Sequence, residues 1–386
     1  MFEILDNHAS GPVIKVIGVG GAGGNAVNHM IEQGVEGVDF VVVNTDAQVL
    51  ARNSARNQIQ LGDSGLGAGA KPEQARDVAM EERERLEETI AGSHMVFITA
   101  GMGGGTGTGA APVVAEVARS LGILTVAVVT KPFGFEGTKR MRLAEQGIEE
   151  LSQHVDSLIV ILNDKLEDVL GEDVTMDDAF RAADDVLNNA VAGIAEIINC
   201  PGLINVDFQD VRTVMSEQGM AMMGSAMASG IDRARIAAEQ AIASPLLEGV
   251  MLAGARGVLV NITATRSSLK HGEVKAVMNT IRSFAAEDAT IIFGAVYDEG
   301  VNEDLRVTVV ATGLGAHATL RQPKPQLVVA QKTGTDNQAV SNGVDYNQLD
   351  AVPAVIRRNR ASTVEALQQS GVDKYDIPAF LRKQAD

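Results

Sequence analysis

Residues 101–109 read Gly-Met-Gly-Gly-Gly-Thr-Gly-Thr-Gly, with six glycines and two threonines. The stretch joins an apolar, strand-like run, Met95–Ala100, directly to a helical run, Ala110–Leu121. Glycine lets main-chain N–H groups approach an anion, and the following helix adds its unpaired N-terminal amides. A flexible linker is disfavoured, because linkers seldom join a strand to an amphipathic helix without a polar spacer. The sequence therefore predicts a cradle for the phosphates of a nucleotide.

A second glycine-rich loop follows the first apolar strand of the chain, where Val13–Ile17 leads into Gly18-Val-Gly-Gly-Ala-Gly-Gly-Asn25. The loop fits the G-x-G-x-x-G fingerprint of dinucleotide-binding proteins, so an NAD-dependent oxidoreductase is the alternative interpretation. Two cradles on neighbouring strands, however, suit a mononucleotide triphosphate better than a dinucleotide. Neither loop ends in the Gly-Lys-Ser/Thr of a P-loop, so a cation or another part of the assembly must replace that lysine.

Apolar strand-like runs alternate with helical stretches in the first half of the chain. Strands are expected at 13–17, 40–43, 95–99, 124–129 and 158–162, and helices at 72–91 and 142–153. This pattern predicts an α/β fold with a doubly wound parallel sheet, whose ligands bind at the carboxyl ends of the strands. A long helix, Met176–Asn199, has apolar residues every three or four positions. A smaller second α/β region follows, with strands at 257–264, 290–296 and 305–311 and helices near 231–243 and 272–284.

Composition narrows the class of protein. The 386 residues carry a net charge of -18, concentrated before Ala316, which would repel the phosphates of nucleic acid. The apolar runs are too short to cross a bilayer and the first residues lack a secretion signal, so we expect a cytoplasmic protein without direct membrane insertion. The single Cys200 excludes an internal disulfide, and the six histidines show no metal-ligand spacing, so no protein metal site is expected.

The end of the chain has a different character. After Gly315 the periodicity fades and Gln, Asn, Ser, Thr, Pro and Lys dominate until about Ser370, which predicts a disordered linker. The last stretch, Tyr375-Asp-Ile-Pro-Ala-Phe-Leu-Arg-Lys383, places apolar anchors among charges. Such a pattern at the end of a tether is suited to docking in the groove of a partner protein.

The two glycine loops, with Thr130-Lys-Pro-Phe-Gly-Phe-Glu-Gly-Thr-Lys-Arg140 and Asn205-Val-Asp-Phe-Gln-Asp210, closely resemble the FtsZ family of bacterial tubulin-like cell-division GTPases. The resemblance covers nearly the whole chain. It implies a filament that assembles head to tail, with GTP at each junction, and forms the division ring at mid-cell. It also implies a GTP-binding domain (1–175), a core helix (176–200), a GTPase-activating domain (201–315), a disordered linker (316–370) and a partner-binding peptide (371–386).

The resemblance assigns a GTP/GDP site residue by residue. Glu136 would accept hydrogen bonds from the ribose hydroxyls, with Arg140 in support. Asp184 would read guanine, because its carboxylate accepts from the ring N–H and the amino group, for which adenine has no equivalent. Phe180 would lie against the purine, although a core role is equally open. The remaining implied contacts are Gly21, Ala22, Gly23, Gly24, Asn25, Gly103, Gly104, Gly105, Thr106, Gly107, Thr130 and Asn163.

The resemblance places catalysis on Asn205, Asp207 and Asp210. In the family these residues enter the pocket of the next subunit, where they orient the attacking water and help to hold Mg²⁺ near the γ-phosphate. Hydrolysis would then require polymerisation. Either acid alone could instead cap a helix, at a position before Val211. A nucleotide-binding scaffold that never hydrolyses GTP is a third interpretation of the protein.

The resemblance also implies binding partners beyond other copies of the chain. The C-terminal peptide would bind the membrane tethers FtsA and ZipA, and other division regulators would bind the filament. The peptide residues concerned are Asp376, Ile377, Pro378, Phe380 and Leu381.

Overall fold

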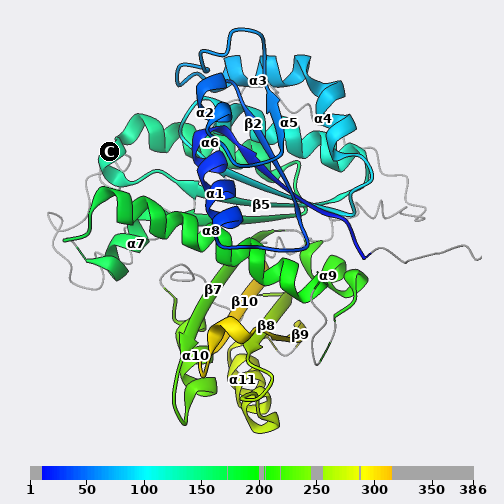
Figure 1. Ribbon diagram of the computed structural model, residues 1–386, viewed down its shortest axis with the longest axis vertical. Helices are drawn as coiled ribbons and strands as arrows, with labels where there is room; N and C mark the ends of the chain where they lie inside the picture. The colour runs from blue at the N-terminus through cyan, green and yellow to red at the C-terminus, as the bar shows by residue number, and fades with distance from the viewer. Residues whose placement is uncertain are drawn as a thin grey trace, which may run out of the picture. The chain divides into compact units, whose positions relative to one another are not determined.

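The computed structural model describes residues 11–171, 173–199, 204, 206–217, 219–244, 255–286 and 288–314. These residues form a ten-stranded sheet in the order β3-β2-β1-β4-β5-β6-β7-β10-β8-β9 (Figure 1). Asn205, Cys200, the predicted linker and the predicted C-terminal peptide lie outside the described residues. None of the described helices is long and apolar enough to cross a bilayer.

Six parallel strands make up the first part of the sheet. Five of them are largely apolar and buried, because helices cover both faces of the sheet, whereas the edge strand β3 is polar apart from Ile59. The pairing of β1 with β2 on one side and with β4 on the other brings the carboxyl ends of these strands to the same edge. The strand order reverses at β1, and such a switch point opens a crevice for ligands. The strands are β1 (Ile14–Val19), β2 (Asp39–Asn44), β3 (Asn57–Gln60), β4 (Met95–Gly101), β5 (Leu124–Lys131) and β6 (Ser157–Leu162).

Helices cover the two faces of this parallel part. One face packs against α1 (Gly20–Glu32) and α8 (Met176–Asn199). The opposite face packs against α3 (Pro72–Glu81), α4 (Arg83–Ile90), α5 (Thr106–Ser120) and α6 (Thr138–Ser152). Two short helices, α2 (Ala47–Ala51) and α7 (Asn163–Leu170), follow β2 and β6. The apolar stripe of α8, including Leu187, Val191 and Ile194, is buried against the sheet.

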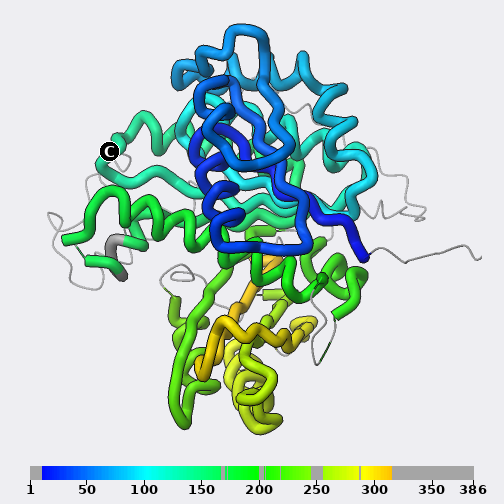
Figure 2. The backbone as a smooth tube through the Cα atoms, in the orientation of Figure 1, coloured from blue at the N-terminus to red at the C-terminus, as the bar shows by residue number. Residues whose placement is uncertain are grey.

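The second α/β region continues the same sheet. Its first strand, β7, runs parallel to β6 but pairs with it at only two positions, whereas β10 lies antiparallel to both β7 and β8. Helices α10 and α11 cover one face, and α8 and α9 pack toward the other. The colours in Figure 2 show the chain passing from the first part, in blue and cyan, to this region, in green and yellow. Its elements are α9 (Phe208–Met215), β7 (Met220–Ala228), α10 (Arg233–Ile242), β8 (Gly257–Ala264), α11 (His271–Phe284), β9 (Thr290–Tyr297) and β10 (Leu305–Leu314).

The fold confirms the predicted doubly wound sheet, the long helix and the second α/β region, and differs in detail. The predicted helix 72–91 is two helices, because Glu82 leaves helical geometry at φ -89° and ψ 14°. The sequence pattern did not predict β3, β7, α2, α7 or α9. The second region also adds strands to the first sheet instead of forming its own. The predicted domain boundaries stay a prediction.

Candidate functional site

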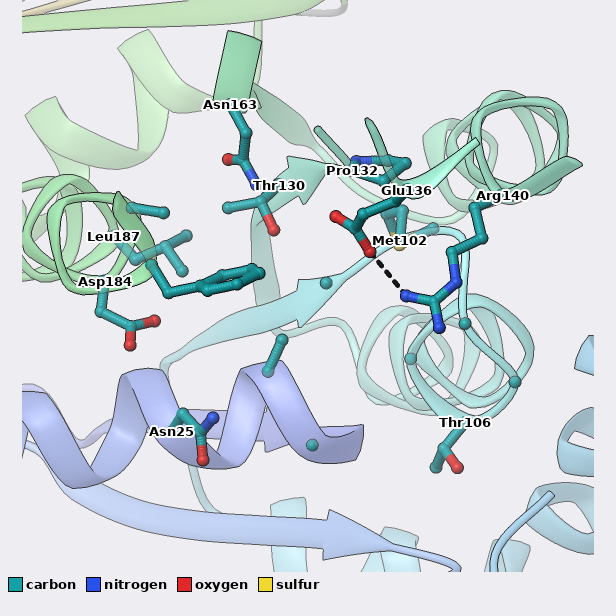
Figure 3. A pocket seen from close by; sticks show the side chains of 18 residues that line it. Asn25, Met102, Thr106, Thr130, Pro132, Glu136, Arg140, Asn163, Asp184 and Leu187 are labelled. Carbon is teal, nitrogen blue, oxygen red and sulfur yellow. Dashed lines mark hydrogen bonds and ion pairs between the residues drawn. The ribbon is translucent and has the colours of Figure 1, made fainter. Parts of the chain in front are cut away.

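A cavity of about 370 Å³ lies at the carboxyl ends of the parallel strands, where the strand order reverses. It collects most of the predicted nucleotide residues: Gly21, Ala22, Asn25, Gly104, Gly105, Thr106, Gly107, Thr130, Glu136, Arg140, Asn163, Phe180 and Asp184. It also includes residues that the sequence pattern did not single out as contacts, namely Gly101, Met102, Pro132, Ala183 and Leu187. Gly23, Gly24 and Gly103 do not line it. Figure 3 shows α1 contributing Asn25 and α8 contributing Asp184 and Leu187.

Two lining glycines, Gly21 and Gly104, leave main chain open to a ligand. A Cβ atom at either position would meet nothing within 4 Å. Neither residue has a positive φ, so backbone geometry does not require glycine there either. The packing of the chain itself therefore gives no reason for glycine at these positions. A molecule that occupies the cavity and contacts the backbone closely provides one.

Other glycines of the two loops serve packing. A Cβ at Gly23 would come within 2.3 Å of the Thr99 carbonyl oxygen, and one at Gly107 within 2.5 Å of the Gly101 carbonyl oxygen. Gly103 has a φ of +99° beside the main chain of Arg140. Gly23 and Gly107 let α1 and α5 approach the strands closely, whereas Gly103 lets the loop after β4 lie against α6. Their predicted contacts with a nucleotide stay predictions.

Two helices begin at the cavity without a side-chain cap. The first turn of α1 starts at Gly20 and that of α5 at Thr106, and neither first turn contains an acidic residue. The first N–H groups of a helix have no partner within the helix, and they carry its positive dipole end. Two such ends at one cavity are suited to binding the phosphates of one nucleotide.

A third loop, after β3, lies against the glycine loop of residues 101–109. A Cβ at Gly105 would come within 3.2 Å of the backbone nitrogens of both Ala70 and Lys71. Ala70 itself has a φ of +56°, which is strained for a residue with a side chain. The Thr45 hydroxyl bonds the Thr106 hydroxyl at 2.7 Å and ties the end of β2 to the start of α5. The glycine-rich run around Ala70 was the sequence signal for this third loop.

The predicted ribose contact is held rigidly. One carboxylate oxygen of Glu136 accepts from the Arg140 guanidinium at 2.5 Å (Figure 3). The other accepts from the Phe133 N–H at 3.0 Å. The Gly134 N–H donates to Asp164, the second residue of α7, at 2.7 Å. Asp164 therefore holds the loop that carries Glu136, a role that its place in the sequence did not reveal.

The opposite end of the cavity is formed by α8. Phe180 and Asp184 are one helical turn apart, and the Phe180 ring meets the edge of the buried Phe133 ring at 5.3 Å between centroids. Burial raises the pKa of the Asp184 carboxyl to about 6, an effect that nearby His29 opposes. At pH 7 this carboxyl is therefore mostly ionised and accepts hydrogen bonds only. Asn163 is buried, and its side-chain oxygen has no hydrogen-bond partner among the described residues. The Asp184 carboxylate and the Asn163 side-chain oxygen can therefore accept hydrogen bonds from a ligand in the cavity.

The predicted catalytic acids lie elsewhere. Asp207 caps α9 by accepting from the Asp210 N–H at 2.8 Å, whereas the side chain of Asp210 is exposed. The first residue of α9 is Phe208. Its ring contacts the ring of His94, which lies just before β4, with the ring centroids 6.1 Å apart. Since the cavity begins at the other end of β4, a strand of seven residues separates the two sites by roughly 20 Å. The structure does not bring these acids to the pocket of the same chain.

Comparisons with known proteins agree with this geometry. Residues 13–171 match the GTPase domain of the Tubulin/FtsZ family, and residues 219–315 match the C-terminal domain of the FtsZ family. The cell division protein FtsZ of Pseudomonas aeruginosa is 55% identical over 100% of both chains, and that of Coxiella burnetii is 55% identical over 99% of both. The solved FtsZ dimer of M. jannaschii is 44% identical, with a TM-score of 0.75 over 79% of this chain and 89% of that one.

The fold and the cavity define a tubulin-like GTPase. The chain belongs to the FtsZ family. Membership implies GTP and GDP binding and a GTP-dependent, polymerising role in cell division. The NAD-dependent oxidoreductase is not favoured.

Proposed function

We propose that the protein hydrolyses GTP at the junctions of a head-to-tail filament, where Asp210 of one copy completes the pocket of the next. The proposal is supported mainly by the separation of the pocket and α9 at opposite ends of β4. Of the two carboxylates that line the pocket, Glu136 is engaged by Arg140, and Asp184 lies on α8 at the base end. Among the described residues, neither of these carboxylates is available at the phosphate end, which favours a catalytic carboxylate from another copy.

The proposed reaction uses water as the nucleophile. Asp210 of the adjoining copy orients the water and accepts its proton as the oxygen bonds to the γ-phosphorus, while the bond to the β–γ bridging oxygen breaks and GDP leaves. The amides at the start of α1 and α5 stabilise the phosphate charge. Asp207 holds the Asp210 backbone through one carboxylate oxygen and has the other available. Asn205 belongs to the proposed catalytic set through family resemblance.

The proposal includes Mg²⁺ bound with the nucleotide. Among the residues that the structure describes, no three His, Cys, Asp or Glu side chains are placed to hold a metal ion. This fits Mg²⁺, which often binds through phosphate oxygens, water and only one or two carboxylates. Phosphate oxygens and Asp210 of the adjoining copy would hold the ion. The Mg²⁺ ion would neutralise phosphate charge, which is the role of the lysine in P-loop proteins.

The proposal assigns the C-terminal peptide to membrane tethering at the mid-cell division ring of the cytoplasm. Its support is the sequence pattern of apolar anchors among charges, suited to FtsA and ZipA. Removing residues 373–386 should abolish binding to both tethers and leave GTP hydrolysis unchanged. Loss of hydrolysis in the truncated protein would contradict this division of roles.

Phosphate release measured against protein concentration, with sedimentation in parallel, tests the shared site. Release per subunit should rise through a threshold at which sedimentable polymer forms. Asp210→Ala should still bind GTP and sediment, but release should fall by roughly a hundredfold or more, as expected for loss of a general base. Gln209→Ala is the matched control, because Gln209 is the exposed neighbour on the same helix. Release per subunit that does not depend on concentration would contradict the proposal.

A further inference from the structure

A buried hydrogen bond closes the glycine loop of residues 101–109 on itself. The Thr108 hydroxyl oxygen accepts from the Gly103 N–H at 2.8 Å, and Thr108 is only 3% exposed. The four residues between these two, 104–107, all line the cavity, whereas Gly103 and Thr108 themselves do not. The bond therefore joins the two ends of the segment that faces the cavity.

Both ends of this segment are also packed against α6. Gly103 has a φ of +99°, and a Cβ there would come within 2.8 Å of the Arg140 carbonyl oxygen. A Cβ on Gly147, about two turns further along α6, would come within 2.4 Å of the Thr108 methyl group. Threonine is branched at Cβ, so a methyl group that is packed at Gly147 also fixes the direction of the hydroxyl. The packing of α6 therefore holds the Thr108 hydroxyl toward the Gly103 N–H.

The segment between the two ends has little else to order it. Three of its four residues are glycine, which has the greatest conformational freedom of any residue. The N–H groups of Gly104 and Gly105 have no hydrogen-bond partner within the described part of the chain. A loop that is ordered before its ligand arrives loses less conformational entropy on binding. The closing bond is thus the contact that can prepare these amides for a ligand.

We propose that Thr108 is a positioning residue for phosphate binding. Its hydroxyl closes the loop, so that the unpaired amides of Gly104 and Gly105 are held in place for the phosphates of the nucleotide. The Gly103 N–H is used within the protein and is not available to the ligand. The inference rests on the proposed function, since it takes the cavity as the site of GTP.

A threonine that only stabilises the fold has a different signature. Its loss would lower the melting temperature and would change the binding of GDP and of guanosine by the same factor, because both ligands carry the same base and ribose. A residue that orders the phosphate loop affects GDP and leaves guanosine, which has no phosphate, unchanged. The ratio of the two affinities therefore separates the two roles.

The test measures the affinities of the full chain for GDP and for guanosine in wild type, Thr108→Val and Thr108→Ser. Valine has the shape of threonine without the acceptor, whereas serine keeps the acceptor. Thr108→Val should weaken GDP binding about tenfold, as expected for the loss of one hydrogen bond, and should bind guanosine like wild type. Thr108→Ser should bind both ligands within about threefold of wild type.

A matched control is Thr125→Val. Thr125 is also buried and its hydroxyl also bonds the main chain, by donating to the Ile123 carbonyl at 3.0 Å, but it lies near the amino end of β5, away from the cavity. This variant should lower the melting temperature and leave both affinities unchanged.

Three results would overturn the inference. They are an unchanged GDP affinity in Thr108→Val, an equal loss of GDP and guanosine binding in that variant, including a complete loss through misfolding, and a Thr108→Ser variant that binds GDP as weakly as Thr108→Val.

Two reference measurements keep these outcomes distinct from failure of the proposed function. Wild type should bind GDP more tightly than guanosine, and Gly104→Val should lose that difference. If either result fails, the loop does not bind phosphates, and the proposed pocket is wrong together with the inference. If both hold and Thr108→Val affects the two ligands equally or not at all, only the inference about Thr108 is wrong.

Discussion

The two ends of the parallel strands differ in how their helices begin. At the carboxyl ends, α1 and α5 start without a side-chain cap and face the cavity. Near the amino ends, α9 starts with Asp207 as its cap and leaves Asp210 exposed. The helix starts at the first end have neither a cap nor an acidic residue in their first turns, whereas α9 is capped by its own Asp207 and exposes the Asp210 carboxylate. Complementary ends of this kind can complete each other between copies but not within one chain.

Filling the phosphate cradle should have the largest effect. Gly104→Val places a branched side chain into open space that nothing else in the protein occupies, so the protein should fold but exclude the phosphates. Loss of two charge-assisted hydrogen bonds costs about 3 kcal/mol or more, which weakens GTP binding at least about a hundredfold. Calorimetric titration with GTP measures the loss. Gly272→Val is the control, because Gly272 is also surrounded by open space but lies on α11.

Mixing the Gly104→Val and Asp210→Ala variants, each expected to be inactive alone, tests whether the pocket end of one copy and the α9 end of another complete each other. Gly104→Val keeps intact acids at α9, and Asp210→Ala keeps an intact pocket. A junction between the intact pocket of Asp210→Ala and the intact acids of Gly104→Val should be active. The mixture should therefore release phosphate faster than either variant alone. If mixing restores nothing although both variants fold, the two ends do not complete each other.

Lowering the pH should weaken guanine recognition at the base end of the pocket. The pKa of Asp184 is about 6, so at pH 5 only about a tenth of this carboxyl is ionised and the guanine preference over ADP should fall about tenfold. Competition between GDP and ADP across pH measures it, and Asp184→Asn should remove the dependence. In the empty protein the sign is opposite. Because the folded pKa lies above the ordinary 3.8, this group adds to the free energy of unfolding as pH falls from 6 toward 4.

Substitution of Asp207 separates a helix cap from a catalytic carboxylate. Asp207→Ala removes the cap of α9 and should cost about 0.5 to 2 kcal/mol of folding free energy. Asp207→Ser keeps a capping oxygen and should preserve the melting temperature, while phosphate release falls, though less than in Asp210→Ala. Thermal unfolding and phosphate release, measured on both variants, give the two effects. Wild-type release from the serine variant would reduce Asp207 to a cap.

The smallest effect is expected at the strained loop of the pocket. Ala70→Gly relieves a positive φ that a side chain disfavours, and should raise the free energy of unfolding by at most about 1 kcal/mol. Chemical denaturation measures this change. Ala68→Gly, in the same loop but without a positive φ, is the control and should destabilise the protein. A loss of stability in Ala70→Gly would show that the loop is not strained at this residue.

Strong local patterns were predictable, and context-dependent elements were not. The helix Met176–Asn199 was predicted with its observed bounds, because its apolar spacing continues over the whole length. The strand β7 was missed, because its sequence of Met, Ala, Gly and Ser has little strand preference and is extended through pairing with β10. The break at Glu82 lies between good helix formers, and it coincides with a bond from Arg83 to Glu116 of α5. Such long-range partners leave no periodic signal.

The candidate site divides in the same way. The glycine loops were recognisable, because each depends on a short stretch of chain. The family resemblance assigned Phe180 and Asp184, which line the cavity, and their roles stay predictions. The role of Asp164 was not recognisable, since it acts on a residue far away in the sequence. The catalytic assignments stay predictions, because no nucleotide or second copy tests them.

The amino-acid sequence by itself determined the local pieces of this protein: two glycine-rich loops, the helix with Asp184 and the acids beside Phe208. Only the tertiary structure decided which pieces meet. The parallel register sends the loops after β1, β4 and β5 to one edge, while the contact between Phe208 and His94 holds α9 at the other. The two ends of a parallel strand are a fixed length apart. The sequence of the strand does not determine at which end a segment distant in the chain, such as α9, will pack.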